Sequence, residues 1–365
     1  MPEANLVNKE QELDNISKDV IGLLKKLIAT PSFSGQEDGT AALIENFLIE
    51  RGIKAYRKSN NIWAKNKYFR PLRPTILLNS HHDTVKPNEG YRLDPFTPIE
   101  QEGKLFGLGS NDAGASLMAL LGAFLYYYDQ DNLKYNFIYA ATAEEENSGA
   151  NGIELVLPKL GHIDFAIVGE PTQMHLAVSE KGLMVLDCVA NGRSGHAARE
   201  EGDNAIYKAM KDIEWFRKYK FPKVSKTLGP VKMTVTMIHA GVQHNVVPDR
   251  CEFTVDVRCT DAYSHEELLD IIRQNIHSEA KPRSMRMRPS SITPSHPFVK
   301  AGIKLGRDTY GSPTTSDQAL IPFTSVKLGP GDSARSHTAD EYVYLHEIEE
   351  GIRIYTQMLD QIVHA

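Results

Sequence analysis

Histidines and acids follow the apolar runs of this 365-residue chain at places where they could bind a metal together. The first run, 76–78, leads through Asn79 and Ser80 to His81 and Asp83. Residues two apart in an extended chain point to the same side, so one nitrogen of His81 can bind a cation while the other donates to Asp83. Alone, a His-x-Asp pair is more often a simple turn, so the other runs decide its meaning.

Two further apolar runs also end in acids. Residues 135–142 have a strand pattern and lead into the acids 144–146, and residues 165–168 lead into Glu170. Three acids in a row usually form a solvated surface, but like charges at the end of an apolar strand repel each other unless a cation lies among them. Because ligands in open α/β sheets gather beyond the carboxyl ends of strands, we expect these strand ends to form one metal site.

A glycine-rich segment at 107–114, Gly-Leu-Gly-Ser-Asn-Asp-Ala-Gly, comes directly before an apolar helix predicted at 116–127. Its spacing matches neither the P-loop nor the Gly-x-Gly-x-x-Gly pattern, which argues against nucleotide binding. Asp112 could simply cap the helix. Alternatively, the glycines let the backbone pass close to a metal while Asp112 points into the site.

Composition excludes several functional classes. The net charge of −6 is made of interspersed signs and provides no basic surface for nucleic acid. A polar, acidic N-terminus and the lack of any long apolar run predict neither a signal peptide nor a membrane span, so a cytoplasmic protein acting on a small molecule is expected. Cys188, Cys251 and Cys259 lack metal-binding spacing and argue against a disulfide framework.

The order of the predicted elements divides the chain into two domains. Residues 1–176 and 294–365 alternate strands and helices and are expected to form a discontinuous α/β domain. Residues 177–293 follow the β-α-β-β-α-β order of a ferredoxin-like α+β unit, inserted into the first domain. Its strands are predicted at 183–190, 231–238, 251–259 and 285–292, and its helices at 204–219 and 264–279. Elsewhere helices are predicted at 15–28, 39–52, 297–309 and 345–363, and strands at 62–64 and 324–328.

Taken in order, the motifs between His81 and Glu341 resemble those of the dinuclear zinc aminoacylase and carboxypeptidase family. Its members include acetylornithine deacetylase, succinyl-diaminopimelate desuccinylase and the glutamate-releasing carboxypeptidases. The motifs include Gly-Glu-Pro-Thr at 169–172 and Ser-His-Thr-Ala-Asp-Glu at 336–341. The resemblance implies a zinc-peptidase-like α/β/α domain with a mixed sheet, and it implies that 177–293 form a lid and dimerisation domain.

The resemblance also implies a role for individual residues. Asp112 would bridge two metal ions, Asp83 would support His81 from behind, and Glu145 would be the general base. His81 and Glu170 would share one metal, and His337 would bind the other. The implied metal ligands are His81, Asp112, Glu146, Glu170 and His337.

Residues of the inserted domain resemble the family's lid motifs. Gly195-His196-Ala197 resembles the motif whose histidine reaches into the neighbouring subunit's site, which implies a homodimer. Asn245 and Arg258 resemble the lid residues that meet the substrate carboxylate. From the residues alone, His196 could be an ordinary turn histidine and Arg258 a surface ion-pair partner.

The chain departs from the family pattern at three positions. Ser80 stands in place of a glycine, Gly114 in place of a frequent lysine, and Glu144 in place of an aspartate. None of these changes removes a ligand, but the triple acid leaves two registers open, Glu144/Glu145 and Glu145/Glu146. We prefer the second because the glycines at 149 and 152 then lie where the family has them.

The implied activity is hydrolysis of the N-acyl amide of a small N-acyl-L-amino acid. Two Zn²⁺ per subunit, with Co²⁺ or Mn²⁺ as possible substitutes, would activate a water whose proton Glu145 takes. Length and motif wording favour an acetylornithine deacetylase-like enzyme of arginine biosynthesis, with acetylcitrulline or a succinyl relative as other substrates. The alternatives are a succinyl-diaminopimelate desuccinylase, a metallo-dipeptidase, and a silent amino-acid-binding module, although binding alone needs no base.

Overall fold

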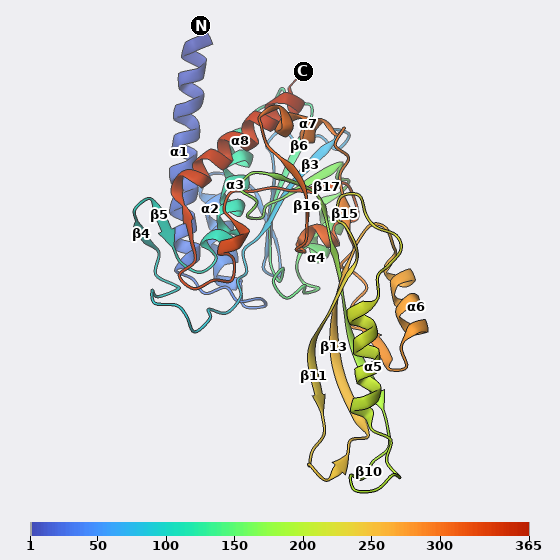
Figure 1. The fold of residues 1–365 in the computed structure, drawn as a ribbon. Coiled ribbons are helices and arrows are strands. Elements are labelled where there is room, and N and C mark those ends of the chain that lie inside the picture. The colour runs from blue at the N-terminus through green and yellow to red at the C-terminus, as the bar shows by residue number, and fades with distance from the viewer. Residues whose placement is uncertain (1, 365) are drawn as a thin grey trace. The chain divides into compact units, whose positions relative to one another are not determined.

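The structure, a computed structural model, describes residues 2–364, so the predicted domain ends at 1 and 365 lie outside the described residues. The chain divides into two compact units (Figure 1). Unit 1 contains the chain up to Val178, then Ser291–Tyr310 and the residues from Ser316 onward. Unit 2 contains Ser179–Ser290 and Gly311–Thr315.

One short segment belongs to a different unit from the one expected. Gly311–Thr315 was predicted in the discontinuous α/β domain but lies in unit 2. Backbone and side-chain bonds to Lys181 hold it there: the Lys181 amide donates to the Ser312 carbonyl at 3.1 Å, and the Thr315 hydroxyl donates to the Lys181 carbonyl at 3.2 Å. Such pairing between distant segments leaves no local sequence signal.

A mixed sheet forms the centre of unit 1, in the order β1-β2-β6-β3-β7-β17-β8. Strands β3, β6, β7 and β17 run parallel, and β1, β2 and β8 add antiparallel pairs. The strands are β1 (Ala55–Lys58), β2 (Asn61–Lys65), β3 (Thr75–His81), β6 (Asn136–Thr142), β7 (Phe165–Val168), β8 (Leu176–Glu180), β15 (Ser290–Ser291), β16 (Thr309–Ser312) and β17 (Ser325–Lys327). A smaller sheet contains β4 (Ile99–Gln101), β5 (Lys104–Phe106) and β18 (Tyr342–Tyr344), where a loop was predicted for part of 85–103.

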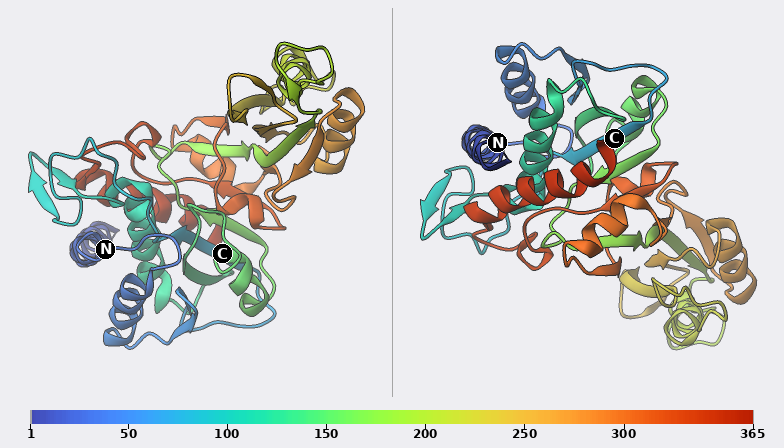
Figure 2. Two further views of the ribbon diagram at one scale, coloured as in Figure 1. Left: turned by 90° about the horizontal axis from the view of Figure 1, so that it is seen from below. Right: turned by 90° about the horizontal axis from the view of Figure 1, so that it is seen from above.

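Helices cover both faces of the unit 1 sheet. They are α1 (Pro2–Ile28), α2 (Asp38–Glu50), α3 (Ala115–Tyr128), α4 (Ile153–Leu160), α7 (Pro297–Lys304) and α8 (Leu345–Val363). Helix α3 packs against both α1 and α8, and Figure 2 shows α8 passing alongside α3. Because both faces are covered, every residue of β3 and β6 is buried, as expected for the central strands of an α/β sheet.

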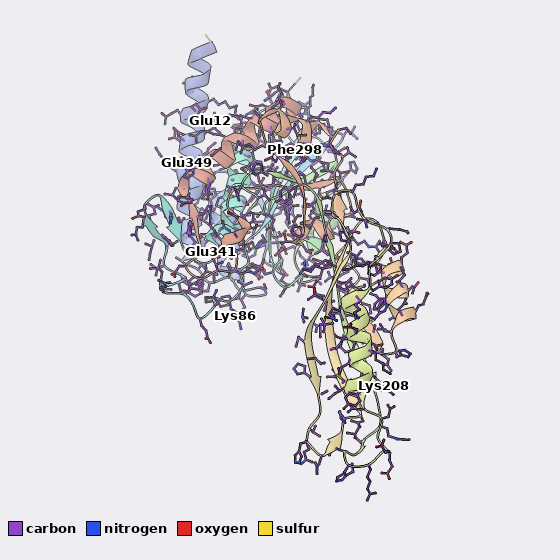
Figure 3. The ribbon with its side chains drawn as sticks, viewed as in Figure 1. Glu12, Lys86, Lys208, Phe298, Glu341 and Glu349 are labelled. Carbon is purple, nitrogen blue, oxygen red and sulfur yellow. The ribbon has the colours of Figure 1, made fainter. Side chains whose placement is uncertain are left out.

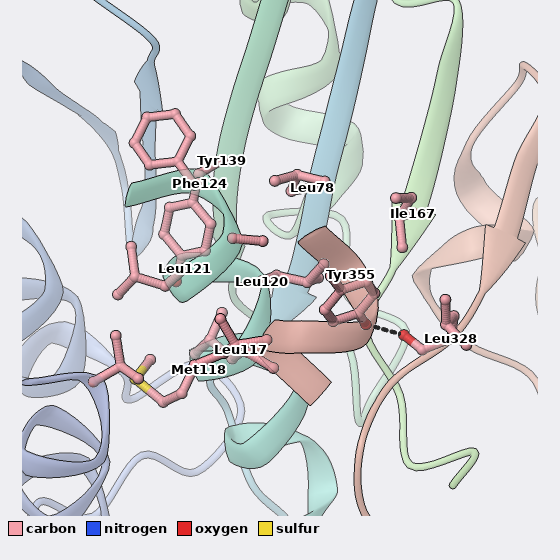
Figure 4. Packing of buried hydrophobic residues seen from close by; sticks show 14 of the residues in the cluster. Leu78, Leu117, Met118, Leu120, Leu121, Phe124, Tyr139, Ile167, Leu328 and Tyr355 are labelled. Carbon is pink, nitrogen blue, oxygen red and sulfur yellow. Dashed lines mark hydrogen bonds between the residues drawn. The ribbon is translucent and has the colours of Figure 1, made fainter. Parts of the chain in front are cut away.

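The main core lies between the sheet and helices α3 and α8. Figure 4 shows Leu78 and Ile167 of the strands facing Leu117 and Leu120 of α3. Tyr355 of α8 is buried in the same cluster, and its hydroxyl donates to the Leu328 carbonyl just beyond β17. This core fixes α3, and therefore the segment before it, against the ends of the parallel strands. The predicted α/β class with a mixed sheet is confirmed.

Unit 2 is an antiparallel sheet in the order β11-β13-β9-β14, accompanied by two helices. Its elements are β9 (Gly182–Asn191), β10 (Gly195–His196), α5 (Ala205–Lys218), β11 (Lys232–Ala240), β12 (Val246–Val247), β13 (Arg250–Cys259), α6 (His265–Asn275) and β14 (Glu279–Pro282). Asn204 caps α5, and Ser264 with Glu267 forms a capping box at α6, so both helices start at signals present in the sequence.

The predicted last strand of this unit was wrong. It was expected at 285–292, but the fourth strand is β14, which pairs with β9 through Glu279 and Val189. Helix α6 ends at Asn275, before the predicted end at 279, because Ile276 takes an extended conformation. Pro282 argued against a strand there, but β14 is at the edge of the sheet, where proline is tolerated.

Within residues 2–364, no helix combines the length and the apolar character needed to cross a membrane.

Candidate metal centre

The parallel strands of unit 1 bring the predicted site residues to one edge of the sheet. In the β3–β6 pair His81 lies opposite Thr142, and in the β3–β7 pair Asn79 lies opposite Val168. The acids that follow β6 and β7 therefore emerge beside His81. The segment 110–114 enters the same place from the start of α3.

His81, Asp112 and Glu170 form a first group that could hold a metal ion. His81 Nε2 lies 3.4 Å from Asp112 Oδ1 and 3.8 Å from Glu170 Oε1. One ligand atom from each residue lies within 4.8 Å of the other two. One imidazole and two carboxylates are donors that suit a divalent ion such as zinc.

Asp112, Glu146 and His337 form a second group. His337 Nε2 lies 3.1 Å from Glu146 Oε2 and 3.6 Å from Asp112 Oδ2. Asp112 thus belongs to both groups and offers a different oxygen to each. This is the arrangement expected of a carboxylate that bridges two ions.

The surroundings of His81 fit a metal ligand. Its Nδ1 lies 3.0 Å from the Asp83 carbonyl oxygen and 3.3 Å from Asp83 Oδ1, while its Nε2 is buried without a hydrogen-bond partner in the described structure. A buried nitrogen left unpaired is costly unless another ligand satisfies it. The neighbouring His82 differs, because its two nitrogens lie 2.9 Å from Thr40 Oγ1 and 2.8 Å from the Asn60 carbonyl.

Asp83 also positions the acids after β6. Its carboxylate accepts the backbone N–H groups of Glu145 and Glu146, both at 3.1 Å, and the Ser34 hydroxyl at 2.7 Å. Glu144 points elsewhere, because its carboxylate accepts both the backbone and the side-chain N–H of Asn151. The structure therefore brings Glu145 and Glu146 to the cluster and leaves Glu144 outside it.

The acids of the cluster are not a solvated surface. The side chains of Glu145 and Glu146 are only 12% and 9% exposed. Burial raises the pKa of Glu145 well above its usual range, and the Glu170, Asp317 and Glu146 carboxylates add to this against the opposing effect of His81. Buried acids that repel one another to this extent make a favourable site for cations.

The two histidines of the cluster have raised pKa values. Burial opposes protonation of His81, but the hydrogen bonds to Asp112 and Asp83 outweigh it and raise the pKa of His81 well above its usual value. The hydrogen bond to Glu146 raises the pKa of His337 to about 9. Both imidazoles are thus surrounded by negative charge, and a divalent ion would compete with the proton for each of them.

Two glycines explain how the backbone carries Asp112 into the cluster. Gly109 has a φ of +75°, and a side chain there would meet Thr84. A Cβ on Gly114 would lie 2.3 Å from the Gly109 carbonyl oxygen, so the turn before α3 closes only without one. Asp112 is therefore no ordinary helix cap, and its carboxylate lies within both ligand groups.

Two buried acids of the site region were missed by the sequence analysis. Asp317 accepts the Thr142 hydroxyl at 2.7 Å and the Asn79 side-chain amide at 3.1 Å, and burial raises its pKa to about 6. Glu341 accepts backbone N–H groups around Asp112, and burial raises its pKa to about 8. Asp317 follows a turn-rich stretch and Glu341 ends a histidine motif, so neither adjoins an apolar strand pattern.

The residues predicted in unit 2 fall into two places. His196 pairs with Val246 in the small β10–β12 ladder, and the Ala197 N–H donates to the Asn245 carbonyl at 3.0 Å, so His196 and Asn245 are neighbours. Arg258 is at the other end of β13, roughly 25 Å away at about 3.3 Å per residue. It forms a two-pronged ion pair with Asp256, at 2.8 and 3.0 Å.

Comparison with known proteins agrees with this arrangement. Residues 77–361 match the model of Peptidase family M20/M25/M40. The chain is 26% identical to a succinyl-diaminopimelate desuccinylase of Orientia tsutsugamushi (strain Ikeda), over 94% of this chain and 96% of the relative. It is 27% identical to an acetylornithine deacetylase of Proteus mirabilis (strain HI4320), over 94% and 97%.

A solved structure shows the same fold. The M20 family metallo-carboxypeptidase Sso-CP2 from Sulfolobus solfataricus superposes with a TM-score of 0.76 at 16% identity, covering 94% of this chain and 98% of that one. The matched family segment contains the metal groups at the strand ends. The chain therefore belongs to Peptidase family M20/M25/M40 and is a metal-dependent hydrolase.

Proposed function

We propose that this enzyme hydrolyses the N-acyl amide bond of a small N-acyl amino acid with the help of two divalent metal ions. One observation carries the proposal: Asp112 offers one oxygen to each of two ligand groups, and Glu145 lies beside them without belonging to either. A site with two ion positions and a separate buried carboxylate has the parts needed for hydrolysis by an activated water.

The ligands divide between the two ions. His81, Asp112 and Glu170 would hold one ion, and Asp112, Glu146 and His337 would hold the other. This mixture of imidazole and carboxylate donors suits Zn²⁺, with Co²⁺ or Mn²⁺ as substitutes. When bound, the ions would lower the pKa of a water molecule and polarise the amide carbonyl.

Glu145 would act as the general base. Its carboxylate takes a proton from the attacking water and passes it to the amide nitrogen, so the C–N bond breaks into a carboxylate and an amine. Asp83 fixes the Glu145 backbone, and the shielded position that raises the pKa of this carboxyl also helps it to hold the proton between the two steps. The His81–Asp83 contacts keep the imidazole in one orientation.

His196, Asn245 and Arg258 of unit 2 are proposed to act on the substrate. His196 would help to stabilise the oxyanion from a second copy of the chain, in agreement with its exposed position next to Asn245. Arg258 lies opposite Lys232 in the β11–β13 ladder and close to Lys181, whose pKa is lowered by burial and by these two cations. This positive group suits a substrate carboxylate, although Asp256 already occupies part of the guanidinium.

A homodimer through unit 2 is proposed on the character of β11. This strand is at the edge of its sheet, and Met237 and Ile238 are 49% and 50% exposed on it. An apolar edge strand is a template for pairing with another chain. The double change Met237→Lys and Ile238→Lys is expected to shift the sedimentation mass from dimer to monomer and to lower activity with it, because His196 then has no partner site.

The matched control for the dimer is Leu72→Lys, which removes a fully exposed leucine of unit 1 and should leave the mass unchanged. A wild-type chain that sediments as a monomer at micromolar concentration, while fully active, would contradict the proposed dimer.

The substrate class is tested by hydrolysis rates on a small panel. Acetylornithine, acetylcitrulline, their succinyl analogues and succinyl-diaminopimelate differ in the acyl group and in the amino acid. We propose an acetylornithine deacetylase-like activity, and with it arginine biosynthesis, with desuccinylation as the second candidate because other similar proteins also bear the desuccinylase name. We expect kcat/KM for one member to exceed the others by at least about tenfold, or 1.4 kcal/mol in transition-state binding. Release of no acyl group from any of them by the metal-loaded enzyme would refute the proposal.

The cytoplasm is the proposed compartment. Cys188, Cys251 and Cys259 are buried free thiols, which agrees with a reducing environment.

A further inference from the structure

The backbone around Asp112 cannot satisfy its own hydrogen bonds. Asp112 has φ −114° and ψ 98°, which is not helical, and Gly109 before it is left-handed. The N–H groups of Gly109, Asn111 and Asp112 therefore find no partner within a regular helical turn. Buried N–H groups of this kind require an acceptor from elsewhere in the chain.

Glu341 is that acceptor for all three groups. Its Oε1 accepts the N–H groups of Asn111 at 2.8 Å and Asp112 at 2.9 Å, and its Oε2 accepts the N–H of Gly109 at 3.1 Å. The backbone carbonyl of Glu341 also accepts the Gly107 N–H at 3.0 Å. Glu341 is 2% exposed, and charge-assisted bonds in such a buried place are strong and directional.

The same short segment carries a proposed metal ligand. Glu341 comes four residues after His337, and Figure 3 labels it near the start of the last helix, α8. The His337 end is fixed by Asn88, whose side-chain amide donates to the His337 carbonyl at 3.2 Å. One segment, 337–341, thus supplies a ligand to one ion group and holds the backbone of the residue that both groups share.

We propose that Glu341 is a positioning residue of the metal centre: its carboxylate fixes the backbone of Asp112 and ties it to the segment that carries His337. The inference rests on the proposed two-metal function. Without Glu341, the 109–112 backbone would have to turn its N–H groups toward water or other acceptors, and the Asp112 oxygens would no longer face both ligand groups.

The test compares Glu341→Gln with Asp340→Asn. Asp340 is the ideal control because it is adjacent in sequence and does the same kind of work on another loop, accepting the Arg92 and Leu93 N–H groups at 2.8 and 3.0 Å. In Glu341→Gln the amide NH₂ replaces one acceptor, so one of the three backbone N–H groups faces another donor. Zn²⁺ affinity is measured on metal-free protein by competition with a chromophoric chelator, and the visible spectrum is recorded after Co²⁺ loading.

We expect Glu341→Gln to weaken Zn²⁺ binding by roughly 10–100-fold, the range typical for residues that orient metal ligands, and to alter the Co²⁺ absorption bands at saturation. Asp340→Asn should bind Zn²⁺ like the wild type and keep its Co²⁺ spectrum. Unchanged Zn²⁺ affinity in Glu341→Gln, or an equal loss in both variants, would overturn the inference. A wild type that binds neither ion would instead refute the proposed function itself.

A second variant covers the case in which Glu341→Gln does not fold, as judged by circular dichroism of the metal-free protein. Glu341→Asp keeps the charge but shortens the side chain, so it can reach only part of the 109–112 backbone. Its Zn²⁺ affinity should fall by at least tenfold, within the same range. Wild-type affinity and an unchanged Co²⁺ spectrum in a folded Glu341→Asp protein would likewise overturn the inference.

Discussion

Replacing Glu145 with glutamine is expected to lower kcat by about 10²–10⁴-fold, the range that a positioned general base contributes, and to leave metal binding intact. Glutamine has nearly the same shape but cannot take a proton from water. The backbone N–H of residue 145 would still donate to Asp83, so the turn that carries Glu146 stays in place. Steady-state rates on the best substrate of the panel, together with metal analysis of the same samples, measure both effects.

Glu144→Gln is the matched control, because it makes the same chemical change one residue earlier. Glu144 binds Asn151 and lies outside both ligand groups, so kcat should change by no more than a few-fold. The pair also decides between the two registers that the triple acid left open. A large loss in Glu144→Gln with full activity in Glu145→Gln would make Glu144/Glu145 the functional pair and refute our assignment.

Much of unit 1 could be predicted because its local patterns and its fold agree. The closing helix was predicted at 345–363 and is α8 (Leu345–Val363), and the strand predicted at 165–168 is β7. Covered on both faces, the central strands are continuous apolar runs, so each strand ends visibly where the polar residues begin. That boundary is what pointed to His81, Glu145, Glu146 and Glu170 as neighbours.

The parts that could not be predicted depend on contacts between distant segments. Glu341 binds backbone groups 229–232 residues away in sequence, and Asp317 binds side chains 175 and 238 residues away. The edge strand β14 has four residues, of which only Ala280 is buried, so no alternating pattern marks it. Arg258 lies where it was expected on its strand, but its pairing with Asp256 was visible only in three dimensions.

Replacing Asp112 with asparagine is expected to disable both halves of the metal centre at once. Asp112 Oδ1 lies 3.4 Å from His81 and Oδ2 lies 3.6 Å from His337, so one substitution removes a charged ligand from each group. Bound Zn²⁺ should fall from two ions per chain to one or fewer after dialysis. The fall in kcat should exceed the roughly 10–100-fold loss that follows from disturbing a residue that only orients a ligand.

Thermal unfolding gives a second readout of the Asp112 change that does not depend on the substrate. An ion that binds only the folded state stabilises it by about 2.7 kcal/mol at a concentration of 100 times its Kd. Wild-type protein should therefore gain Tm when Zn²⁺ is added to the metal-free form, and Asp112→Asn should gain far less. Asp94→Asn, at an exposed loop aspartate outside both groups, should behave like the wild type. Full Zn²⁺ content in Asp112→Asn would show that the two groups do not depend on a shared carboxylate, and the bridging role would have to be abandoned.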